Sequence, residues 1–131
     1  MSRLARLLIL ASLLGFSMGL AGAATAEGPA VTQFVSIDTK GNNDALLSYA
    51  ASNEKIFKRL GIKATRRYIQ ASLAGDFSGT LAVVIEYPSL IALAEAQAKL
   101  SKDAEWQKYI DAITDSGMIV ESNSLWVDVT P

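Results

Sequence analysis

The order in which strand and helix patterns follow one another constrains the fold of this chain more than any other feature. Residues 31–38 are rich in β-branched and aromatic side chains, which predicts a first strand. Apolar residues then recur at three- and four-residue spacing over residues 44–60, which predicts a helix. Asn42 or Asn43 is a suitable N-cap for this helix, and Gly61 is a stop signal.

A predicted hairpin follows the first helix. Residues 62–73 and 80–87 have strand composition, and the residues between them, 74–79, have turn composition. The second of these strands is apolar at almost every position, a pattern typical of a strand that is buried on both faces.

The last third of the chain returns to helix and then to strand. Pro88 ends the preceding strand, and Ser89 is a suitable N-cap for a helix over residues 90–100. A second helical piece over residues 101–117 ends at a glycine, and residues 118–129 predict a final strand.

The complete order is βαββαβ, the ferredoxin-like split-βαβ arrangement within the α+β class. Its four-stranded antiparallel sheet carries helices on one face only. Because the strand over residues 80–87 is apolar on both faces, we expect a second subunit to cover the open face.

The N-terminus has the three parts of a secretory signal peptide. Arg3 and Arg6 precede an uncharged, apolar stretch, and small residues follow it. Ala24-Thr25-Ala26 matches the cleavage pattern, so residues 1–26 are expected to be removed; a cut after Ala23 is the alternative.

Cleavage would leave residues 27–131 as one domain, exported to the periplasm or secreted. An uncleaved membrane anchor is the competing interpretation, because an uncharged run of about 20 residues can just span a bilayer. Gly15, Gly19 and Gly22, together with the good cleavage site, favour removal, so we expect no membrane attachment of the mature chain.

The composition excludes several chemistries. The chain has no cysteine, so the exported domain has no disulfides, and it has no histidine, which rules out Ser-His-Asp and Cys-His catalysis and makes zinc and copper sites improbable. Without Arg3 and Arg6, ten basic residues face thirteen acidic ones, a net charge of about −3. Nucleic-acid binding needs a positive field and therefore has little support.

Three local features carry a family resemblance. Residues 84–89, Val-Ile-Glu-Tyr-Pro-Ser, run from a strand directly into a helix; the helix break is followed by Asp103-Ala104-Glu105-Trp106; and a short closing strand ends near Val129. Over residues 31–129 the chain resembles the dimeric α+β barrel superfamily, within it the NIPSNAP-like and antibiotic-biosynthesis-monooxygenase-like groups.

This resemblance implies a homodimer whose two sheets face each other, with a pocket between sheet and helices in each subunit. Members of the superfamily range from cofactor-free oxygenases and isomerases to haem enzymes and proteins without known activity, so fold does not settle function. Haem binding through histidine is excluded here, and no cofactor is expected.

Two adjacent arginines in an otherwise apolar strand are the first candidate site residues. Alternation places Arg66 and Tyr68 on one face of the strand and Arg67 on the other. One arginine could point into the pocket and hold a carboxylate or enolate, with Tyr68 as a donor. The alternative is a cross-strand ion pair with Glu86, opposite Arg67 in one hairpin register and opposite Arg66 in the other.

Three further candidates are aromatic or amide side chains. Trp106 lies on the apolar side of the last helix, near Tyr109, and Trp126 lies in the final strand on the face opposite Leu125. Both tryptophans could form the wall of a pocket for a flat ligand, or belong to the core or a dimer interface. Asn53, among the apolar positions of the first helix, could orient a ligand oxygen or bond a neighbouring side chain.

Three functions remain open at this point. The first is an exported homodimer that binds a small molecule between sheet and helices. The second is a cofactor-independent monooxygenase-like or isomerase-like enzyme, which needs at least one free arginine and a ligand-sized pocket near Trp106. The third is a structural module whose sheet face docks another envelope protein.

Overall fold

The computed structural model describes residues 28–72 and 75–131. The expected signal peptide, residues 1–26, lies outside the described residues, and so do two residues of the expected hairpin, 73 and 74. None of the helices in the described ranges is long and apolar enough to cross a membrane.

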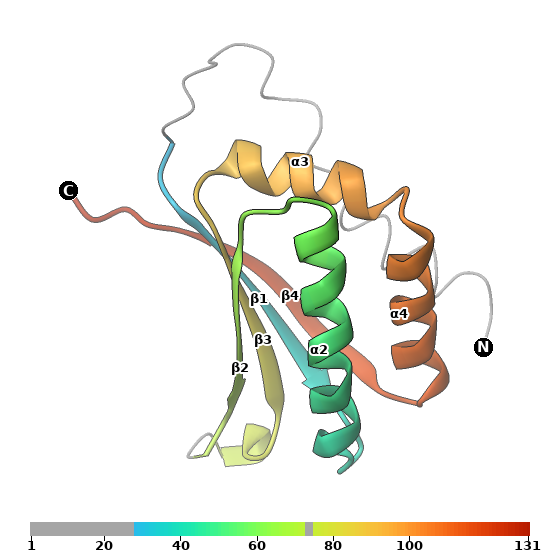
Figure 1. Cartoon of the computed structure of the whole chain (residues 1–131). Helices are drawn as coiled ribbons and strands as arrows, with labels where there is room; N and C mark the ends of the chain where they lie inside the picture. The colour runs from blue at the N-terminus through green and yellow to red at the C-terminus, as the bar shows by residue number, and fades with distance from the viewer. Residues whose placement is uncertain (1–27, 73–74) are drawn as a thin grey trace.

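The described part contains three α-helices and four strands (Figure 1). A single 3₁₀ turn, Gly75–Phe77, lies in the hairpin loop. In chain order the helices and strands are β1 (Val31–Asp38), α2 (Asn43–Arg59), β2 (Thr65–Gln70), β3 (Leu81–Tyr87), α3 (Leu90–Leu100), α4 (Ala104–Asp115) and β4 (Ile119–Val127).

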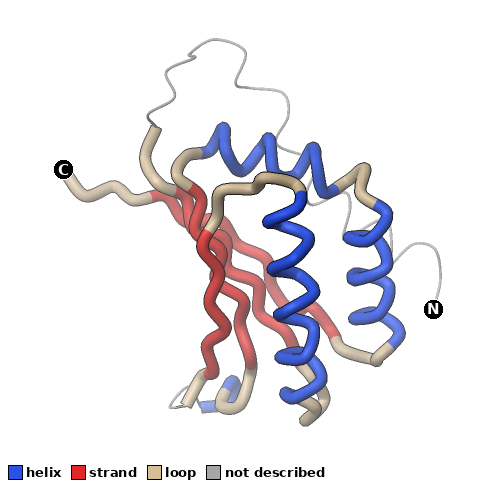
Figure 2. The backbone as a smooth tube through the Cα atoms, viewed as in Figure 1, coloured by secondary structure: helices blue, strands red, loops and turns tan. Residues whose placement is uncertain are grey.

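The strands form one four-stranded antiparallel sheet in the order β2-β3-β1-β4. The three helices lie on the same side of this sheet, as Figure 2 shows. This architecture confirms the α+β prediction and is compatible with a ferredoxin-like fold. The other face of the sheet carries none of these three helices, and it is called the open face below.

The ends of α2 follow the predicted signals. The Asn42 side chain accepts a hydrogen bond from the Ala45 N–H at 3.2 Å, which satisfies a donor that the first turn leaves free. At the other end Gly61 has φ of 65°, and the Ile62 N–H donates to the Phe57 carbonyl at 2.9 Å. This bond commits Ile62 to the helix end, so β2 starts at Thr65, later than the predicted residue 62.

Asp103 joins the helices at the corner between α3 and α4. Its side chain caps α4 by accepting the Trp106 N–H at 2.9 Å, and it also accepts from Arg59 at the end of α2. The Trp106 N–H and then Arg59 hold the pKa of this carboxyl below its usual value. One residue thereby fixes where α4 starts relative to α2.

The core lies between the sheet and the helices, with β3 at its centre. Every residue from Leu81 to Ile85 is buried, which confirms the prediction of a strand buried on both faces. Leu81, Val83 and Ile85 belong to the helix-side core cluster, whereas Val84 points to the open face and is still only 3% exposed.

We expect Leu46→Ala to lower the free energy of unfolding by about 2–5 kcal/mol, because this side chain of α2 is fully buried in the core and its truncation leaves a cavity. Its neighbour Leu47 is 44% exposed, so Leu47→Ala should change stability by less than about 0.5 kcal/mol. Urea denaturation of both variants measures the difference, and equal losses would contradict this packing of α2.

Candidate functional site

The register of the β2–β3 hairpin separates the two candidate arginines. Thr65 lies opposite Glu86, Arg66 opposite Ile85 and Arg67 opposite Val84, so both registers considered from the sequence are wrong. The difference arises because β2 ends at Gln70, opposite Leu81, so the loop between the two strands is longer than the predicted residues 74–79.

Arg67 lies on the open face of the sheet. Its Nη2 meets Glu86 Oε1 at 2.6 Å along the diagonal of the hairpin, and its side chain is 63% exposed. Arg67 therefore forms the ion pair with Glu86 that was considered from the sequence, although the two residues are not directly opposite each other in the hairpin. An exposed pair of this kind adds little stability.

Arg66 points the other way, under α2. Its side chain is only 3% exposed, and Nη2 contacts Glu54 Oε2 at 2.5 Å, while the guanidinium carbon lies 4.0 Å from the centre of the Phe57 ring. The ring face attracts the cation and covers it from water. Nε and Nη1 are also buried, and neither has a hydrogen-bond partner among the described residues.

Two further unsatisfied polar atoms belong to side chains that interact with Tyr109. They are the Tyr68 hydroxyl and the Asn53 Oδ1, both buried without a well-formed hydrogen bond to any residue the structure describes. The Tyr109 side chain is close enough to both to interact weakly with each. Native proteins satisfy nearly all buried polar groups, so four such atoms in one region, two of them on Arg66 itself, are unusual.

The positive charge of Arg66 acts on three surrounding phenols. Burial raises the pKa of Tyr68 to about 12, with a further increase from Tyr109 and an opposing effect of Arg66. Burial likewise raises the pKa of Tyr87 to about 12 and that of Tyr109 above its usual value, and Arg66 opposes both shifts. At neutral pH these phenols are therefore hydrogen-bond donors rather than bases.

Trp106 completes the aromatic wall of this region. It stacks on Tyr109 with ring centres 5.0 Å apart and packs edge-on against Phe57 with ring centres 6.1 Å apart. Phe57 in turn contacts Arg66, so the Phe57 ring connects Trp106 to the arginine. We call the whole group the Arg66 cluster. Its members are Asn53, Glu54, Phe57, Arg66, Tyr68, Tyr87, Trp106 and Tyr109.

The structure thus brings four of the six candidates together and separates two. Arg66, Tyr68, Asn53 and Trp106 share the helix side of the sheet. Trp126 lies on the open face, 64% exposed, with its indole N–H donating to Ser124 Oγ at 3.0 Å, on the same face as Arg67. A single pocket containing both tryptophans is excluded.

Glu54 and Phe57 are members of the cluster that sequence reasoning did not single out. Phe57 follows Asn53 by four residues, so the two share one face of α2, and Glu54 lies at the border of that face. The spacing of Asn53 and Phe57 can be read from the sequence. That Arg66 lies beneath this face of α2 follows only from the pairing of β2 with β3.

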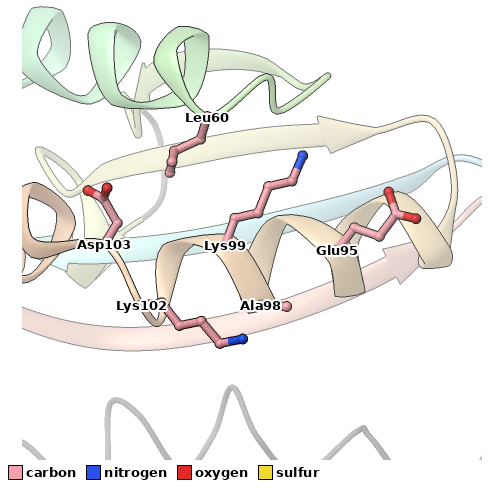
Figure 3. A pocket seen from close by; sticks show the side chains of 6 residues that line it. All are labelled: Leu60, Glu95, Ala98, Lys99, Lys102 and Asp103. Carbon is pink, nitrogen blue, oxygen red and sulfur yellow. The ribbon is translucent and has the colours of Figure 1, made fainter.

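One surface depression of about 510 Å³ lies elsewhere, beside α3 (Figure 3). Its charged side chains come from α3 and the turn after it, and Leu60 closes it from the end of α2. Asp103 on its rim is already engaged with Arg59, and none of the six candidate residues lines it. It offers no buried polar group to orient a ligand.

The Arg66 cluster has the composition of a binding site for an organic anion. A buried guanidinium supplies charge and several N–H donors, neutral phenols and an amide supply further polar groups, and aromatic rings supply flat apolar walls. Within residues 28–72 and 75–131, no group of acidic side chains is arranged to hold a metal ion.

Comparison with known proteins adds no family to this description. No protein-family model matches the chain, and no curated protein matches it significantly. The resemblance to dimeric α+β barrels therefore rests on the order of the elements and on the local features named above.

We expect the free energy of unfolding to fall as the pH rises from about 10 to about 12. The folded state holds Tyr68 and Tyr87 neutral up to about pH 12, whereas the unfolded chain releases these protons near the ordinary pKa of 10.0. Their contribution is fully present below pH 10 and is lost above it. Urea denaturation at stepped pH should show a shallower decline for Tyr68→Phe and Tyr87→Phe, and unchanged slopes would contradict the burial of these phenols.

Proposed function

We propose that this protein is an exported small-molecule-binding protein that holds an organic anion, a carboxylate or enolate, between its sheet and its helices. The observation that carries the proposal is the Arg66 side chain, 3% exposed, with buried Nε and Nη1 groups unpartnered among the described residues. Export is supported by the sequence of residues 1–26.

The burial of Arg66 favours a ligand over a purely structural role. Burying a cation is costly unless it is fully paired and hydrogen-bonded, and here a single carboxylate oxygen contacts it. An anion between α2 and β2 would supply acceptors to the unpartnered N–H groups. Tyr68 could donate its hydroxyl to the same anion, because its raised pKa keeps it protonated at neutral pH.

The geometry favours binding over catalysis. Both arginines are ion-paired, and the depression beside α3 does not include Trp106. The enzyme hypothesis, in contrast, required at least one free arginine and a ligand-sized pocket near Trp106. The phenols of the cluster are too weakly acidic to act as general bases near neutral pH.

We also propose that the open face of the sheet packs against a second copy of the chain. Its central position is apolar, with Val84 beside Phe34, and the β4 edge carries Trp126, 64% exposed. Ile69 adds apolar surface on the β2 edge at 41% exposure. A small domain without disulfides gains stability by burying such a face, as the resemblance to dimeric barrels implies.

We expect Arg66→Gln to weaken the binding of a probe carboxylate by about tenfold or more, because charge-assisted hydrogen bonds are among the strongest polar contacts. Arg67→Gln is the matched control, since it removes an adjacent arginine from the opposite face. Calorimetric titration with benzoate measures both. Equal benzoate affinity in the two variants, or a larger loss of affinity in Arg67→Gln than in Arg66→Gln, would contradict the proposed site.

We expect the native mass, measured by gentle electrospray, to be twice the subunit mass. Trp126→Glu should shift the protein toward monomer, because it places a charge on the open face. Phe77→Glu is the control, since Phe77 is similarly exposed, at 65%, but lies in the loop between β2 and β3. A wild-type monomer would overturn the homodimer and leave the open face to a different partner.

A further inference from the structure

The ion pair between Glu54 and Arg66 is unequal in its exposure. The arginine side chain is 3% exposed, whereas the glutamate side chain is 74% exposed. The carboxylate therefore reaches inward from the surface of α2 and meets the buried cation at its Nη2.

Such a pair is easily exchanged on the carboxylate side. A carboxylate that leaves the pair regains full hydration, so the glutamate itself loses little free energy when it departs. The buried arginine has no comparable alternative, because its remaining N–H groups are shielded from solvent and unpartnered within the described residues. An anion that offers Arg66 more hydrogen-bond acceptors than Glu54 does can therefore replace Glu54 in the pair.

We propose that Glu54 is a displaceable counter-ion that occupies the anion site when no ligand is bound. An incoming carboxylate replaces Glu54 at the Arg66 guanidinium, and the glutamate swings into solvent. This inference rests on the proposed function, since it concerns the ligand class and the closure of the same site.

The exchange selects ligands by charge. A neutral ligand cannot compensate Arg66 and so cannot release Glu54. A ligand with two carboxylates would place its second charge close to the released Glu54, and like charges at short range repel. The site therefore favours monocarboxylates.

The test compares benzoate, its neutral analogue benzamide and the dicarboxylate isophthalate on the full-length protein by calorimetric titration. In the wild-type protein we expect benzoate to bind more tightly than either of the others. Glu54→Gln should bind benzoate about fivefold more tightly, since it removes the internal competitor, and should leave benzamide unchanged.

Two variants guard the interpretation. Glu105→Gln removes another exposed glutamate of an arginine ion pair outside the cluster, and it should leave benzoate affinity unchanged. Glu54→Asp keeps the charge on a side chain too short to reach Arg66 equally well, so it should also bind benzoate more tightly. This second variant serves if Glu54→Gln fails to fold by circular dichroism.

The outcomes separate the two proposals. Benzoate binding that requires Arg66 but is equally tight in the wild-type protein and in both Glu54 variants overturns the counter-ion role alone. Absence of binding to the wild-type protein and to both Glu54 variants overturns the proposed anion site as well. Weaker benzoate binding in both Glu54 variants would show that Glu54 supports the site instead of competing for it.

Discussion

The pairing of β3 with both of its neighbours is the constraint on which the rest of the structure depends. Each residue from Leu81 to Tyr87 lies opposite a residue of β1, and most of them also lie opposite a residue of β2. Alternation along this one strand decides which side chains face the helices. Because Ile85 faces the helices, Arg66 beside it must do so too, and the charge is carried into the interior by the register.

A cation in this position shapes the region around it. The Phe57 ring covers the cation, and Glu54 compensates its charge from the surface. Its field opposes the increase in pKa that burial causes in the nearby phenols. Replacing such a pair by apolar residues is often neutral or stabilising in other proteins, so stability alone does not account for an arginine here. The anion binding that we propose would give the charge a role that packing does not.

Local signals in the sequence predicted most of the fold. The N-cap at Asn42 and the stop at Gly61 act within one helical turn, and the strand order follows from the sequence of periods. The register of β2 with β3 was not predictable, because turn composition over residues 74–79 does not fix the residue at which the loop begins. The start of β2 was not predictable either, because the Ile62 N–H could remain in the helix end or join a strand. That choice depends on packing between segments far apart in the chain.

The candidate site was predictable only in part for the same reason. Arg66 and Tyr68 were identified because charge in an apolar strand is unusual, and their shared face followed from alternation. That Glu54 and Phe57 of α2 would close over Arg66 depended on how the helix lies across the sheet, which no local pattern encodes. Trp126 was assigned to its correct face, but its face is not the one that holds the cluster.

Adjacent positions in β2 belong to surfaces that do not touch each other. Arg66 faces the helices and Arg67 the open face, with the thickness of the sheet between their side chains. Point changes at these neighbouring codons can therefore alter the interior and the exterior independently during evolution. Insertion or deletion of a single residue in β2 has the opposite character, since it exchanges the two sets of side chains between faces. A substitution in this strand thus acts on one surface at a time, whereas a change in its length acts on both.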